Sequence, residues 1–142
     1  INNENIVFHG RKPNKMMSAF YEQSDFLIVS LVDQPAFSIT VPSKTQTYIA
    51  AKKPILAIIN GETADLIVDF KLGLHAHPSD ISGITRLFNF CLEMDNNDRD
   101  KFTENCDHLL KTIFDKELTI SALLEGLVSI PQYGANESDY TN

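Results

Sequence analysis

The sequence has no tryptophan, only two cysteines and no long hydrophobic run among its 142 residues. Cys91 and Cys106 both lie in segments with helical spacing, so we expect reduced thiols rather than a disulfide framework or a structural zinc site. The apolar stretch 55–59 is far too short to span a bilayer. The opening residues, INNENIVFHG, lack the pattern of a secretory signal peptide.

Positive charge is scarce as well, because 12 Lys and Arg residues stand against 19 Asp and Glu residues, a net charge of −7. The first 53 residues carry six basic and four acidic side chains (+2), and the remainder carries six and fifteen (−9). This balance argues against binding of nucleic acid by an extended basic surface. The early part of the chain can still hold a small anion, because the local field decides that.

Apolar strings alternate with segments of helical spacing along the chain, and 43% of the residues are hydrophobic. This alternation predicts an α/β fold class, with a Rossmann-like parallel sheet flanked by helices over residues 1–128. Residues 129–142 are polar and are expected to form a disordered tail. The expected strands are 5–10, 25–32, 54–59 and 73–77, and the expected helices are 14–24, 44–52, 60–70, 78–94, 97–115 and 118–128.

Finer expectations accompany these elements. The strands 25–32 and 54–59 are apolar throughout, which is typical of strands covered on both faces. Ser79 is expected to cap the helix that follows it. In the helix 60–70, the spacing predicts that Ala64, Ile67, Val68 and Phe70 face inward.

The stretch TVPSKTQTYIAAKKPILAII, residues 40–59, crowds hydroxyl groups and a lysine into the start of a helix. Ser43 and Gln46 have the spacing of a capping box, which needs a single hydroxyl. Lys44 falls in the first turn, where the helix dipole disfavours a cation unless an anion sits at the helix start. Two interpretations therefore stay open: these residues merely start and solubilise the helix, or they hold an anion.

Ligands of open parallel sheets bind beyond the carboxyl ends of the strands, where loops lead into helices. Three such exits are expected here, at 10–12, 32–43 and 60–62. Glu62 lies in the first turn of its helix, where a structural role alone would explain a carboxylate.

Other chemical motifs are weak. His75 and His77 could form a metal pair on one face of an extended segment, but no third ligand is near in sequence. The acidic stretch 95–100 lacks the central glycine of a calcium loop. Nucleophile-elbow and dinucleotide-binding glycine motifs are missing, and no strand end carries the Asp of a phosphoacceptor domain. Catalytic residues stay unassigned, and no metal site is expected.

The string VPSKTQTYIAAKKPILAIINGETADLI, preceded by NIVFHGRKP and MMSAFYEQSDFLIVSL, resembles the C-terminal domain of GT-B-fold glycosyltransferases of the family 4 type. It is most similar to the bacterial branch that builds O-antigen, capsule and similar surface polysaccharides. The resemblance runs from about Asn5 to Leu127 and implies that residues 1–128 are part of a nucleotide-sugar-binding domain, with UDP as the usual nucleotide.

Carried over to this chain, the resemblance implies that the turn 10–12 touches the base and that Ser43 and Lys44 lie near the diphosphate. Thr47 stands where many relatives carry the second Glu of a Glu-x7-Glu pair, which holds the ribose hydroxyls. The first Glu falls near Ile39, so both carboxylates are absent. The residues expected to bind the donor are Gly10, Arg11, Lys12, Ser38, Thr40, Ser43, Lys44, Thr47 and Glu62.

The resemblance also implies an N-terminal acceptor domain and earlier strands that this chain does not contain, so we expect a fragment that does not transfer sugar alone. The whole enzyme is expected to act without a metal cofactor. It would move a hexose or N-acetylated amino sugar to a saccharide or lipid-linked acceptor. The implied location is cytoplasmic, with peripheral contact at the inner face of the bacterial plasma membrane left open.

A second, non-enzymatic hypothesis remains. The same crevice would suit a small flavodoxin-like module that binds another phosphate ligand or a protein. An open reading frame that begins just before Ile1 favours this module, whereas about two hundred coding residues upstream favour the transferase.

Overall fold

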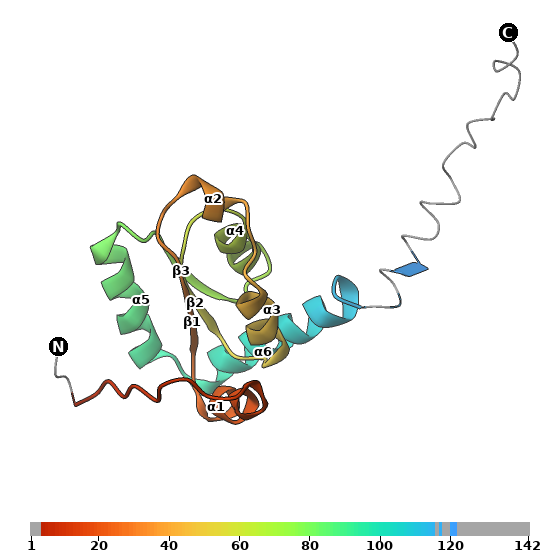
Figure 1. Ribbon diagram of the computed structural model, residues 1–142, viewed down its shortest axis with the longest axis horizontal. Helices are drawn as coiled ribbons and strands as arrows, with labels where there is room; N and C mark the ends of the chain where they lie inside the picture. The colour runs from red at the N-terminus through yellow and green to blue at the C-terminus, as the bar shows by residue number, and fades with distance from the viewer. Residues whose placement is uncertain (1–3, 116, 118–119, 122–142) are drawn as a thin grey trace, which may run out of the picture.

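The computed structural model describes residues 4–115, 117 and 120–121, in which strands and helices alternate (Figure 1). Three short strands are separated by helices, and two longer helices follow the last strand. The elements are η1 (Asn14–Met16), α1 (Met17–Gln23), β1 (Leu27–Ser30), α2 (Pro35–Ser38), α3 (Ser43–Ala50), β2 (Ile55–Ile58), α4 (Glu62–Asp69), β3 (Gly73–Ala76), α5 (Ile81–Glu93) and α6 (Asn96–Thr112).

The three strands form one parallel sheet in the order β1-β2-β3. Leu27 pairs with Ile55 at one end of the sheet, and Ile58 pairs with Ala76 at the other. Helices α3, α4 and α6 lie on one side of the sheet and α5 lies on the other (Figure 1). The predicted α/β class is therefore confirmed as a small open parallel sheet flanked by helices, an arrangement compatible with a Rossmann-like fold.

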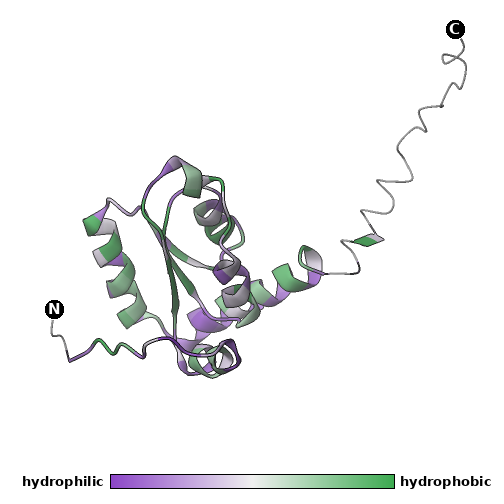
Figure 2. Ribbon diagram, in the orientation of Figure 1, coloured by the Kyte–Doolittle hydropathy of each residue, from purple (hydrophilic) through white to green (hydrophobic). Residues whose placement is uncertain are grey.

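The main core lies between the sheet and the three helices on its larger side. The strands are apolar, whereas these helices carry both apolar and polar residues (Figure 2). Ile49 of α3, Ile67 of α4 and Leu109 of α6 are all completely buried there. Removing each such side chain from water contributes roughly 1.5–3 kcal/mol. This cluster is the principal source of stability for the described part of the chain.

The other face of the sheet is covered less completely, by α5 alone. Leu87 of α5 packs on Leu56 of β2 and Ala76 of β3. Ile28 of the edge strand β1 remains 44% exposed on this face. The expectation that both faces of the strand at 25–32 are covered is therefore wrong, because the single helix packs over the other two strands.

The strand expected at 5–10 is also wrong. Residues 5–10 have no regular structure, and Ile6, Val7 and Phe8 are 51%, 69% and 89% exposed. A strand exists only where a neighbouring strand accepts its hydrogen bonds, and within the described residues this segment has none. The residues of this segment favour a strand, but no strand of the described residues pairs with it.

Two helix starts differ from the expectation. Pro42 is the N-cap of α3 and accepts a bond from the Thr45 N–H at 2.8 Å, so Ser43 is the first helical residue and makes no side-chain cap. Asp80, and not Ser79, caps α5, because the Asp80 carboxylate accepts a bond from the Gly83 N–H at 2.8 Å. The predicted capping box at Ser43 and the cap at Ser79 are therefore corrected.

Helix α4 buries a narrower stripe than predicted. Val68 is 53% exposed and Phe70 is 37% exposed, whereas Ala64 and Ile67 are buried as expected. One helix face is enough to cover β2 and β3, so residue 68 points to solvent. The helix expected at 118–128 lies, except for residues 120 and 121, outside the described residues, and so does the tail 129–142.

Candidate functional site

The carboxyl ends of the three strands bring three polar side chains together. Asn60, after β2, donates a bond from Nδ2 to Asp33 Oδ1 at 3.2 Å, and His77, after β3, places Nε2 3.4 Å from Asp33 Oδ2. The Ser79 N–H donates to His77 Nδ1 at 3.2 Å, which leaves the ring proton on Nε2, facing the carboxylate. One carboxylate thus links the loops that follow all three strands.

The loop between β1 and α3 is held against the start of α4. The Thr63 hydroxyl, which is fully buried, donates to the Thr40 carbonyl at 3.0 Å. Gly61 has a φ of 82°, and a Cβ at this position would overlap the carbonyl oxygen of Ser38. Only a residue without a side chain at position 61 allows the backbone of this turn to approach the backbone of Ser38 so closely.

The short helix α2 lies inside this loop, in a stretch where the sequence predicts no regular element. The Ser38 hydroxyl donates to the Pro35 carbonyl at 2.8 Å, and the Thr40 hydroxyl donates to the Ala36 carbonyl at 3.0 Å. The hydrogens of these two predicted donor-site hydroxyls are therefore used locally. Their oxygens keep lone pairs that can accept a hydrogen bond from a ligand.

The start of α3 is open to solvent. Ser43, Lys44 and Thr47 are all exposed, and the Thr47 hydroxyl donates back to the Ser43 carbonyl at 3.2 Å. Thr45, between them, is completely buried, and its hydroxyl has no hydrogen-bond partner. An exposed lysine beside the unpaired N–H groups of a helix start can attract an anion.

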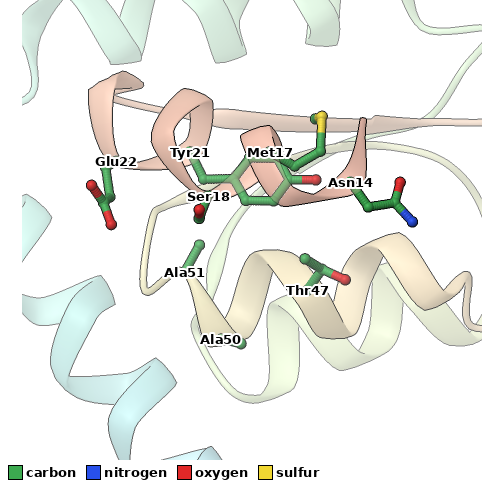
Figure 3. A pocket seen from close by; sticks show the side chains of 8 residues that line it. All are labelled: Asn14, Met17, Ser18, Tyr21, Glu22, Thr47, Ala50 and Ala51. Atoms are coloured by element: carbon green, nitrogen blue, oxygen red, sulfur yellow. The ribbon is translucent and has the colours of Figure 1, made fainter. Parts of the chain in front are cut away.

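A groove of about 440 Å³ runs between α1 and α3 (Figure 3). Asn14 and Thr47 lie at one end of it, and Tyr21 projects over it from α1. The ring of Tyr21 meets the ring of Tyr48 edge-on, with centroids 5.5 Å apart. Burial, together with the neighbouring Tyr21 phenol, raises the pKa of Tyr48, so the Tyr48 phenol stays uncharged at neutral pH.

A second groove of about 470 Å³ is lined by Arg11, Lys12, Pro13 and Asn14. Asn14 lines both grooves, so the groove of the cationic loop and the groove that Thr47 lines adjoin at this residue. Gly10, with a φ of 65°, provides the turn before the two cations. Because the segment 5–10 is not a strand, this turn is not an exit of the sheet, and that part of the expectation is wrong.

Three other predicted donor residues lie outside both grooves. Ser43, Lys44 and Glu62 line neither of the two grooves, although all three are exposed. Glu62 is the first residue of α4, where its carboxylate suits the helix dipole. Whether any of the nine predicted residues contacts a donor stays a prediction.

The described residues include no group of three or more His, Cys, Asp or Glu side chains placed to hold a metal ion. His75 Nε2 instead lies 2.8 Å from the Ile59 carbonyl, and His77 faces Asp33. Within the same part of the chain, every helix is too short or too polar to cross a bilayer.

Sequence reasoning missed Asp33 and Asn60 as partners of His77. A signal was present, since each is a polar residue that follows an apolar strand of the predicted sheet. Comparison of this chain with protein-family models, curated proteins and solved structures gives no match. The class of protein that the structure itself defines is an α/β domain with a polar edge at the carboxyl ends of its strands.

Proposed function

We propose that this chain is the donor-binding part of a GT-B-fold, family 4 type glycosyltransferase of bacterial surface-polysaccharide synthesis, with a UDP-sugar as donor. The observation that carries the proposal is that Asn14 lines both the groove of Arg11 and Lys12 and the groove of Thr47. The resemblance links these two segments, which are far apart in sequence, to one nucleotide.

The proposed division of labour follows from the chemistry of the groups. Lys44 and the unpaired N–H groups of the α3 start stabilise the negative charge that develops on the departing diphosphate. The loop 10–12 contacts the base, and Thr47 supplies a hydroxyl in place of the carboxylate that holds ribose in many relatives. A metal is not required on the diphosphate, because the helix start and Lys44 provide the compensating charge.

The proposal is tested by titrating the chain with UDP and recording backbone amide shifts by NMR. We expect shifts at residues 10–14 and 43–47, and a Kd of about 1 mM or above because Ser43, Lys44 and Thr47 are exposed to solvent. Replacing Lys44→Ala removes one charge contact and should weaken binding about fivefold, which corresponds to about 1 kcal/mol.

The matched control is Lys101→Ala, which removes a surface lysine that pairs with Asp98 on α6. It should leave the UDP affinity unchanged. Equal affinity for UDP in the Lys44→Ala variant and the original chain would overturn the role assigned to Lys44. Pyrophosphate alone binding as tightly as UDP would favour the flavodoxin-like phosphate module instead.

A further inference from the structure

A separate groove of about 500 Å³ lies between the edge strand β3 and helix α5. Its apolar part is formed by Leu74 and Ala76 of the strand and by Leu87 and Phe90 of the helix. None of the nine residues predicted to bind the donor lines it. The volume is within the range of 300–1,000 Å³ that is typical of small-molecule sites.

Phe90 is the exposed aromatic surface of this groove. It lies four residues after Arg86 on the same face of α5, and it is 44% exposed. It does not belong to the smaller core cluster that Leu87 forms with the sheet. A ring held at the wall of a groove without serving the core offers its face to a ligand.

The polar groups of the groove include both hydrogen-bond donors and acceptors. Arg86 makes one long contact, from Nη2 to Asp80 Oδ2 at 3.4 Å, and its guanidinium is otherwise exposed. The Asp80 side chain is held in place by the Gly83 N–H, and a Cβ on Gly83 would overlap that carboxylate. His77 is oriented by Asp33 and Ser79. Asp80 and His77 are therefore held in position by neighbouring groups of the chain.

The pattern of charge and shape selects the chemistry of the ligand. A free anion would meet the Asp80 carboxylate beside Arg86, and a cation would meet the guanidinium, so neither sign of charge is favoured. A purely apolar ligand would leave the charged pair without water. A neutral polyhydroxyl ligand satisfies both Arg86 and Asp80, because its hydroxyls accept hydrogen bonds from the guanidinium and donate hydrogen bonds to the carboxylate. The C–H face of the same ligand packs on Phe90.

We propose that the groove between β3 and α5 is a binding site for a neutral pyranose saccharide, distinct from the proposed nucleotide site. Arg86 and Asp80 bind the hydroxyls, and Phe90 packs against one face of the sugar ring. The inference does not depend on the proposed donor function, since it uses other residues and another pair of elements.

The experiment is NMR titration of the chain with methyl α-D-glucopyranoside, methyl α-D-galactopyranoside and N-acetyl-D-glucosamine, up to about 50 mM, which detects a Kd of about 10 mM. At least one sugar should shift the amides of residues 74–77 and 83–90. Phe90→Ala should weaken its binding at least tenfold. Absence of shifts with all three sugars would overturn the proposal.

Phe88→Ala is the matched control, because Phe88 is on the same helix, is 42% exposed and lines a different groove. It should leave the sugar affinity within a factor of two (about 0.4 kcal/mol). Thermal unfolding of both variants checks that α5 stays folded. Equal losses in the two variants, or inorganic phosphate producing the same amide shifts as the sugar, would contradict a neutral-saccharide site.

The two proposals fail separately. UDP titration reports on residues 10–14 and 43–47, and sugar titration reports on the β3–α5 groove. A chain that binds a sugar but not UDP keeps this inference and loses the proposed function.

Discussion

At the scale of single residues, two buried threonines in the first turns of neighbouring helices show how differently a hydroxyl can be placed. Thr63 of α4 donates to the Thr40 carbonyl, and so fixes the loop that precedes α3. Thr45 of α3 is equally buried, and its hydroxyl has no partner. A buried hydroxyl without a hydrogen bond costs stability, whereas a paired one adds to it.

Thr45→Val keeps the β-branched shape and removes the unpaired hydroxyl, so we expect the free energy of unfolding to rise by about 1 kcal/mol. Thr63→Val removes a bonded hydroxyl and should lower it by about 1 kcal/mol. Urea unfolding followed by circular dichroism measures both changes. A loss of stability in Thr45→Val would show that the hydroxyl contributes to the native fold.

At the scale of elements, the turns at the carboxyl ends of the strands decide how the loops are arranged. The β2–α4 turn at Gly61 supports the loop that carries Ser38 and Thr40. Asp33 then ties this loop to Asn60 and His77. The predicted donor residues of this loop are therefore positioned by side chains outside the predicted set.

Gly10 and Gly61 both have positive φ, but only Gly61 also lies in close contact with another backbone segment. Replacing each by alanine therefore separates the stability cost of the backbone conformation from the cost of the close contact. At Gly61 a Cβ would overlap Ser38, whereas at Gly10 nothing lies within 4 Å. We expect Gly10→Ala to cost about 1 kcal/mol from conformation alone, and Gly61→Ala to cost at least about 1–2 kcal/mol more. Chemical denaturation measures the difference. Equal costs would mean that the loop moves away freely from the turn.

At the scale of the whole molecule, the two faces of the sheet are unequally protected. Three helices cover one face, and Cys106 lies completely buried within that core. One helix covers the other face, where Cys91 is only partly buried and lines a groove of about 800 Å³ beside Ile28. Local opening should therefore expose the second face before the first.

The two thiols report this asymmetry. Burial, with a smaller contribution from the Asp107 carboxylate, raises the pKa of Cys106 from 9.0 to about 11. At pH 8, about one Cys106 thiol in a thousand is ionised while it stays buried, so iodoacetamide should label Cys91 first. Mass spectrometry over time measures the order, and labelling of Cys106 before Cys91 would contradict the assigned burial.

The same shift has a consequence for stability. The folded state holds the Cys106 proton more tightly than the unfolded chain does. The contribution of the protonated thiol to the free energy of unfolding is therefore fully present below pH 9 and is lost as the pH rises towards 11. The Cys106→Ala variant should lack the part of the stability loss at high pH that deprotonation of this thiol causes. Denaturation midpoints measured between these pH values with both chains make the comparison.

The sequence alone determined the order and type of most elements, because apolar strings and helical spacing report burial directly. The strands around 27–30, 55–58 and 73–76, and the helices between and after them, follow that pattern. Local signals were less reliable at helix starts. Ser43 and Ser79 have the residue type of a cap, but the chain places Pro42 and Asp80 there.

The tertiary structure decided what depends on partners distant in sequence. Residues 5–10 have strand character but no neighbouring strand among the described residues, so they stay exposed and irregular. The polar cluster of Asp33, Asn60 and His77 forms because three parallel strands end at one edge. Pairing and proximity are properties of the folded chain, since a pattern of residues specifies which side chains avoid water but not which of them meet.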